Sequence, residues 1–138
     1  MHISPRLILL AFVALLPLPG RADEVDDLRK KFLGDPTVSA AIKQAIQKRV
    51  VVRGMCPQQA FAAAGLPGLY KVQADPKWKQ SVPPPVIISA QCEKPDKSVI
   101  ELLFRSKTQF ATKDLVVFRV RFENGQAMLI DRKKISFP

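Results

Sequence analysis

The strongest constraint on the fold lies near the C-terminus, where two segments of strand character flank an Asn-Gly pair. Over residues 115–123 every second residue is apolar, namely Val116, Phe118, Val120 and Phe122. The residues between them are smaller or polar. A period of two is typical of a strand that buries one face. Asn124-Gly125 is a preferred pair for a tight hairpin turn, so we expect residues 127–132 to return as an antiparallel strand.

Three further segments have strand character and would extend this hairpin into a sheet. They cover residues 69–73, 86–92 and 99–105, each short, apolar or alternating, and bounded by turn-forming residues. A polar, proline-rich loop over residues 75–85 separates the first two and contains Trp78. We therefore expect a five-stranded antiparallel sheet. Its open face would carry Glu101, Arg105, Arg119 and Arg121.

A helical pattern precedes the strands. Apolar residues recur at positions i, i+3, i+4, i+7 and i+8, namely Val38, Ala41, Ile42, Ala45 and Ile46. This spacing predicts a helix that ends near Arg49 and is followed by an extended link over residues 50–52.

The stretch RGMCPQQAFAAAGLPG, residues 53–68, predicts a second, shorter helix between turns. Cys56 occupies the cap position, and Gly65 can end the helix in a left-handed conformation. Pro57 suits the first helical position. The turn residues of this unit are Gly54, Pro57, Gly65 and Pro67. The predicted fold is α+β, with two N-terminal helices packed on one face of a small antiparallel β-sheet, in a single domain over residues 36–138.

The first 22 residues have the layout of a secretory signal peptide. Arg6 precedes an apolar run over residues 7–16, prolines follow, and Gly20-Arg21-Ala22 is a small-residue exit. The run is about ten residues long, whereas a bilayer span takes about 20. We expect cleavage after Ala22 and a periplasmic mature chain that does not span the membrane, with a retained anchor as the alternative. Residues 23–35 would form a charged, partly disordered tail.

Removal of the first 22 residues would leave 20 basic and 12 acidic residues, a formal charge of +8, and no histidine, because His2 lies within them. Without histidine, Ser-His-Asp and Cys-His nucleophile systems are excluded, as are the common zinc sites that use histidine, and two cysteines are too few for a four-cysteine site. We expect no enzyme activity, metal or cofactor. The positive charge either favours an anionic partner or serves solubility alone, and export disfavours nucleic acid.

The two cysteines, Cys56 and Cys92, allow two interpretations. In an exported chain two cysteines most often pair. Their bridge would close a loop of about 36 residues and stabilise the fold by roughly 3–4 kcal/mol in the chain-entropy model. Alternatively, a free Cys56 thiol at a helix start would have a lowered pKa and would be reactive. We expect the disulfide, with Cys56 as a structural staple.

The candidate interaction residues are aromatic or cationic. Trp78 is flanked by Lys77 and Lys79, and an exposed tryptophan beside lysines suits a protein or lipid contact. The alternative is a tryptophan folded over the sheet edge. The period of two places two arginines on one strand face, which is either solvated or a basic docking surface. That candidate surface consists of Arg105, Arg119, Arg121 and Lys133.

Several of these motifs together resemble a known family. Gly54-Met55-Cys56-Pro57-Gln58-Gln59, the alanine-rich turn after it and Gly65-Leu66-Pro67 resemble the signature of the BamE-like (SmpA/OmlA) outer-membrane assembly proteins. The Phe122–Gln126 segment fits the family's last hairpin, and the resemblance covers roughly residues 38–130. It implies two helices on a three-stranded antiparallel sheet and a non-enzymatic role in scaffolding outer-membrane protein assembly, with anionic lipid as a further contact. The chain departs from the family in lacking a lipobox cysteine and in having Cys56 where members carry threonine.

Two functions follow as hypotheses. The first is an exported, non-enzymatic cell-envelope binding or accessory module with a protein partner, and with anionic lipid as an additional one. The second is an inhibitor or immunity-type protein that binds a secreted or periplasmic enzyme. A third class, a thiol-redox enzyme, would require a free Cys56.

Overall fold

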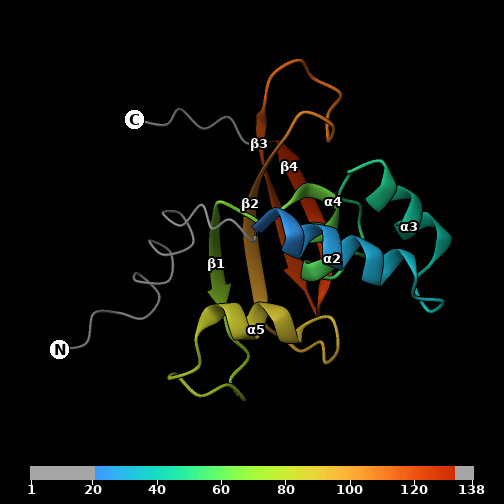
Figure 1. The fold of residues 1–138 in the computed structure, drawn as a ribbon. Helices are drawn as coiled ribbons and strands as arrows, with labels where there is room; N and C mark the ends of the chain where they lie inside the picture. The colour runs from blue at the N-terminus through green and yellow to red at the C-terminus, as the bar shows by residue number, and fades with distance from the viewer. Residues whose placement is uncertain (1–20, 133–138) are drawn as a thin grey trace.

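The computed structural model describes residues 21–132 and has an α+β fold with four helices and a four-stranded antiparallel sheet (Figure 1). Most of the expected signal peptide, together with Lys133, lies outside the described residues. In chain order the elements are α2 (Arg21–Leu33), α3 (Ala40–Gln47), α4 (Pro57–Ala64), β1 (Leu69–Gln73), α5 (Pro84–Ala90), β2 (Val99–Ser106), β3 (Val116–Glu123) and β4 (Gln126–Arg132).

The sheet is a meander in which each strand pairs with the next along the chain, in the order β1-β2-β3-β4. The Asn124-Gly125 turn is confirmed: both residues have positive φ, 51° and 76°, and the strands pair from Glu123 opposite Gln126. A register shift follows beside Arg121 and Phe122, as expected of a β-bulge, which strengthens the local twist. The predicted alternation on β3 is confirmed, because every second residue from Val116 to Phe122 is buried.

The core lies on the face of the sheet that points toward the helices. Phe104 and Phe118 are cross-strand partners with stacked rings 5.5 Å apart, and Phe122 lies opposite Ile100. These side chains are at most 1% exposed. Large, rigid apolar groups of this kind supply most of the hydrophobic stabilisation of a small domain.

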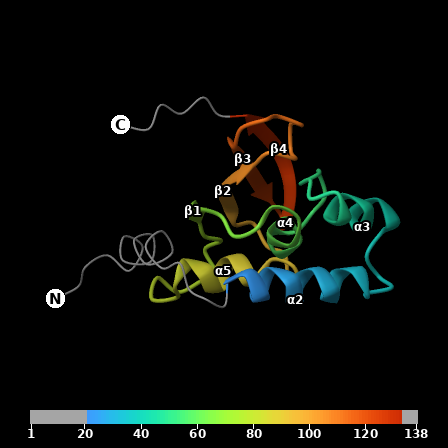
Figure 2. The ribbon, with the colours of Figure 1, turned by 45° about the horizontal axis from the view of Figure 1, so that its top comes forward.

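Helix α4 packs against this core from the other side, together with residues of α2, α3 and α5 that belong to the same cluster. Ala60, Ala62 and Ala63 are buried in the same cluster as the sheet residues, and the Phe61 ring lies 6.3 Å from that of Phe104. Small alanine side chains permit close approach of the helix to the sheet. Figure 2 shows α4 between the sheet and α2.

Helix α2 replaces the partly disordered tail expected over residues 23–35. Its apolar residues Val25 and Phe32 are buried, and the Arg29 Nε donates 2.8 Å to the Ala62 carbonyl at the end of α4. The prediction was wrong because the helical spacing of these few apolar residues finds a partner only in the tertiary structure, on α4. Short helices with little intrinsic stability depend on such packing.

Helix α5 overturns the strand predicted over residues 86–92. Pro84 and Pro85 occupy the first helical turn, where their missing N–H groups cost nothing. The buried residues then follow at helical spacing, namely Pro84, Ile87, Ile88 and Gln91. The expected arrangement of two helices and five strands is therefore corrected to four helices and four strands.

Candidate functional site

The predicted disulfide is confirmed: Cys56 and Cys92 are bonded, with their Cα atoms 5.2 Å apart. Cys56 is the N-cap residue of α4, and its N–H donates 3.0 Å to the Gln59 Oε1, three residues on. The backbone N–H of Gln58 points at the Cys92 sulfur, 3.4 Å away. The bridge therefore ties the start of α4 to the loop after α5, and no thiol is left for chemistry among residues 21–132.

The glycine turn before α4 also fixes the edge of the sheet. Gly54 has φ of +92°, and its N–H donates 3.0 Å to the Ala127 carbonyl on β4. The Ala127 N–H returns a 2.7 Å bond to the Met55 carbonyl. The turn thus brings the start of α4 beside the β3–β4 hairpin.

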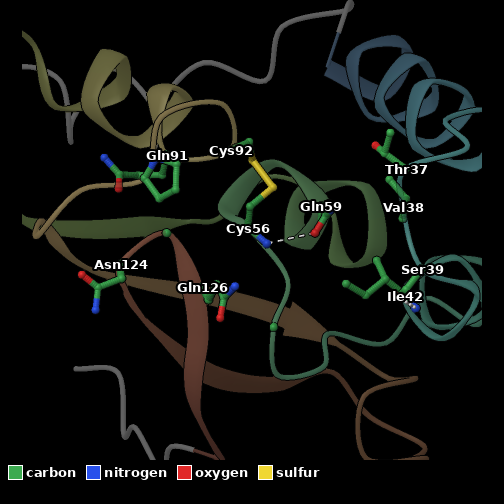
Figure 3. A pocket seen from close by; sticks show the side chains of 13 residues that line it. Thr37, Val38, Ser39, Ile42, Cys56, Gln59, Gln91, Cys92, Asn124 and Gln126 are labelled. Carbon is green, nitrogen blue, oxygen red and sulfur yellow. Dashed lines mark hydrogen bonds between the residues drawn. A yellow bond between two sulfur atoms is a disulfide. The ribbon is translucent and has the colours of Figure 1, made fainter.

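A pocket of about 340 Å³ opens where these segments meet (Figure 3). It is lined by residues from four stretches, 37–42, 54–59, 91–95 and 124–126. In Figure 3 the side chains of residues 37–42, at the start of α3, lie on one side of the pocket. The hairpin residues Asn124 and Gln126 lie on the other side, and the disulfide lies between the two groups. The structure therefore brings five of the turn and cysteine residues selected from sequence to one place: Gly54, Cys56, Cys92, Asn124 and Gly125. We call this site the disulfide pocket.

Trp78 lies elsewhere and is half-buried. Its Nε1 donates 2.7 Å to the Asp96 Oδ2, and the ammonium group of Lys77 lies 5.4 Å from the Trp78 ring centre and 3.3 Å from the same carboxylate. The backbone N–H of Ser98 donates 2.7 Å to the other oxygen. The indole N–H of Trp78 thus already has a hydrogen-bond partner. The contacts with Asp96 hold the loop that carries Trp78 against the segment just before β2.

Asp96 anchors this loop as a carboxylate. Burial alone would raise the pKa of Asp96, but hydrogen bonds from Ser98, and then from Trp78 and Gln91, outweigh it and hold the pKa well below the usual range. A depressed carboxyl pKa contributes stability that is complete above about pH 5 and lost as the pH falls below about 4.

We expect Asp96→Asn to lower the free energy of unfolding by about 1–3 kcal/mol at pH 7, because it removes hydrogen bonds to a charged acceptor. The difference should shrink as the pH falls from about 5 toward 2, because the unfolded parent binds a proton at this carboxyl at a higher pH than the folded parent does. Trp78 is the chain's single tryptophan, so urea unfolding followed by its fluorescence measures both values. An unchanged difference at pH 3 would contradict the assigned role of Asp96.

The predicted arginine face is present, but its arginines are paired with acids. Arg119 Nη2 lies 2.6 Å from Asp131, and its Nη1 lies 3.2 Å from Glu101. Arg121 Nε lies 2.9 Å from Glu123. The pKa of Arg119 is raised mainly by its hydrogen bond to Asp131, and the negative charge of Glu101 raises it further. In this ladder three acids face two arginines, so it forms no positive surface of its own. Arg105 is exposed on the same sheet face.

A different group of cations is brought together by the β2–β3 loop, and sequence reasoning missed it. Thr108 Oγ1 donates 2.7 Å to the Arg49 carbonyl just after α3, and the side-chain amide of Gln109 bonds both the N–H and the carbonyl of Val51, at 2.7 and 2.8 Å. The Thr112 N–H donates 3.0 Å to the Lys107 carbonyl and closes the loop. The group, which we call the basic end, consists of Lys48, Arg49, Lys107, Lys113 and Arg132.

The members of the basic end are exposed, and no ion pair within residues 21–132 uses them. Burial lowers the pKa of Arg29, the charge of Arg49 lowers it further, and the charge of Asp26 raises it. Leu115, at the end of the same loop, is 59% exposed. Asp114 is the one acidic residue between β2 and β3.

Within the described part of the chain, no group of three or more His, Cys, Asp or Glu side chains could hold a metal ion. No described helix has both the length and the apolar character to cross a bilayer. Comparison of the chain with known protein families, curated proteins and solved structures finds no match.

Proposed function

We propose that this chain is an exported, non-enzymatic binding or accessory module of the cell envelope, similar in role to the BamE-like proteins, and that it docks a protein partner through its basic end. The observation that supports this most directly is the basic end itself. Five exposed cations without ion-pair partners among the described residues surround a loop that presents Leu115 to solvent.

Charge and apolar surface serve different purposes at such a site. Unpaired cations speed encounter with an acidic surface and set its orientation. An exposed leucine supplies apolar area that becomes buried on contact. The loop is held by the Thr108 and Gln109 hydrogen bonds to residues 49 and 51, so little conformational entropy would be lost on binding.

The expected cleavage after Ala22 falls within helix α2, which begins at Arg21, and would remove its first two residues. It would leave Asp23 and Glu24 in the first turn of the helix, where carboxylates are favoured by the helix dipole. Export and periplasmic location remain part of the proposal and are tested by fractionation of cells that produce the full chain.

The docking proposal is tested with the double variant Lys107→Glu/Lys113→Glu. We expect its association with isolated envelope membranes to fall at least tenfold, because two charges reverse at the centre of the basic end. Raising the salt concentration from about 50 to 300 mM should weaken the parent in the same direction, since salt screens exposed charges. Cosedimentation measures both effects.

The matched control is Lys71→Glu/Lys79→Glu, which makes the same charge change at exposed lysines outside the basic end. It should bind within about twofold of the parent. Equal losses in the two variants would contradict docking through the basic end. Protein-free vesicles with phosphatidylglycerol separate the partners: variant-sensitive binding there, as strong as binding to the membranes, would replace the protein partner with anionic lipid.

A second candidate function is the inhibitor of a secreted or periplasmic enzyme. It is favoured by the rigid ladder of Asp131, Arg119 and Glu101 on the open sheet face, because preorganised charged groups can recognise a complementary enzyme surface without reordering. A tight one-to-one complex with an enzyme, unaffected by Lys107→Glu/Lys113→Glu, would favour this function over the first.

A further inference from the structure

We propose that the disulfide pocket is a binding site for an uncharged segment of polypeptide, recognised mainly through its peptide groups. The site is separate from the basic end: it lies at the N-terminal ends of α3 and α4 and at the β3–β4 turn, whereas the basic end follows α3 and spans the β2–β3 loop. Peptide binding in the disulfide pocket can therefore be tested independently of docking through the basic end.

The lining of the disulfide pocket carries no charged side chain. Of the thirteen residues that line the pocket, none is Lys, Arg, Asp, Glu or His. A quarter of the chain's residues are charged, so a lining drawn at random would contain about three. A charged ligand that leaves water for this pocket would find no opposite charge to replace its hydration. The lining thus favours a neutral ligand.

The polar side chains that line the pocket include several carboxamides. Gln59, Asn124 and Gln126 offer carboxamides. The two hydroxyl groups of the lining are already bonded: Thr37 Oγ1 donates 2.7 Å to the Asp35 Oδ1, and Ser39 Oγ accepts from the Ile42 N–H at 3.2 Å. Carboxamides both donate and accept, as peptide groups do. The Gln59 oxygen already accepts from the Cys56 N–H, which leaves its NH₂ group as the donor. Asn124 and Gln126 are exposed beside the pocket, so their amides can reach a ligand.

Helices α3 and α4 both begin at the pocket. The N-cap residues of both α3 and α4, Ser39 and Cys56, belong to the lining. The start of a helix carries a partial positive charge, which attracts an acceptor such as a carbonyl oxygen. The carbonyl oxygens of a neutral polypeptide are acceptors of this kind.

The walls of the pocket are held firmly. The disulfide joins the α4 start to the loop after α5. Gly125 fits so closely that a Cβ built there would lie 2.6 Å from the Pro95 Cβ and 2.8 Å from the Gln91 carbonyl oxygen. Val38, Ile42 and Pro95 add apolar surface for the side chain or Cα of a peptide. With about 340 Å³, the pocket is near the lower end of ligand sites and suits a short segment.

The test uses the uncharged peptide mimic N-acetylglycine methylamide and the full exported chain with its disulfide intact. Nitrogen-15 NMR titration should show saturable shifts of the amide signals of residues 37–42, 54–59 and 124–126, and none on β2. For so small a probe the dissociation constant is expected to be roughly millimolar. N-acetylglycine, which carries a carboxylate, and N-acetylglucosamine should each bind at least fivefold more weakly.

Gln126→Ala removes one carboxamide from the rim and should weaken the mimic about two- to tenfold, the effect of one lost hydrogen bond. Gln73→Ala, which truncates an exposed glutamine on β1, is the matched control and should leave binding unchanged. The proposal is overturned if the mimic gives no saturable shifts up to about 50 mM, if the carboxylate or the sugar binds more tightly, or if both variants bind equally well.

Discussion

The double variant Cys56→Ser/Cys92→Ser is expected to lose about 4 kcal/mol of unfolding free energy. The disulfide spans 36 residues, and in the chain-entropy model a closed loop of that length restricts the unfolded chain by about this amount. For a domain of this size the melting temperature should fall by about 15 °C. Urea unfolding monitored by Trp78 fluorescence gives the value directly. Total stabilities of such domains are only about 5–15 kcal/mol, so this is a large fraction.

Reduction supplies the control. The parent chain in reductant should match the double variant in oxidising buffer, and the variant itself should not respond to reductant. A loss of unfolding free energy below about 1 kcal/mol would show that the disulfide does not stabilise the fold as expected.

Gly125→Ala is expected to lower the free energy of unfolding by roughly 2–5 kcal/mol. The residue has φ of +76°, a conformation that costs a residue with a Cβ about 1–2 kcal/mol. The added methyl group would also meet the Pro95 Cβ at 2.6 Å and the Gln91 carbonyl oxygen at 2.8 Å, and overpacking of this kind typically costs a further 1–3 kcal/mol. Since backbone atoms cannot yield like a flexible side chain, the turn must shift.

Gly68→Ala is the matched control, because Gly68 lacks a positive φ and a Cβ built there meets nothing within 4 Å. It should change the free energy of unfolding by less than about 0.5 kcal/mol. If the two alanine variants were equally stable, the tight docking of the β3–β4 turn against Pro95 would be wrong.

Four of the five predicted strands are present in the sheet, because the sequence signals for them are local. Alternation marked β2 and β3, the Asn124-Gly125 pair set the hairpin, and β1 was predicted with the bounds that it has. Helix α4, with its cap at Cys56 and its end at Gly65, was also predicted correctly. In each case a short-range rule and the tertiary structure favour the same conformation.

The two errors, at α5 and α2, have different causes. In α5 that face begins with Pro84 and ends with Gln91, so the two isoleucines between them were interpreted as part of a strand. In α2 the charged residues outnumber the apolar ones, and the alanine surface of α4 that stabilises the helix was not identifiable as its partner. Tertiary packing decided both.

The candidate sites depended on long-range geometry. The sequence indicated that Arg119 and Arg121 share a face, but it could not give the strand register that pairs Arg119 with Asp131. The basic end exists because Thr108 and Gln109 bond residues 49 and 51, more than 50 positions away. The disulfide pocket needs four separate stretches. A basic loop with an exposed leucine, residues 107–115, was the one signal in the sequence that could have identified the basic end.

The most direct test of the central claim is site-specific photocrosslinking in living cells. A photoreactive amino acid is placed at Lys107 in the basic end and, in a separate chain, at Gln73 on β1 as the control. The account predicts one discrete crosslinked envelope protein from position 107, lost when Lys113→Glu is added, and none from position 73. Crosslinks of equal yield from both positions, or a crosslink from position 73 alone, would contradict docking of a protein partner through the basic end.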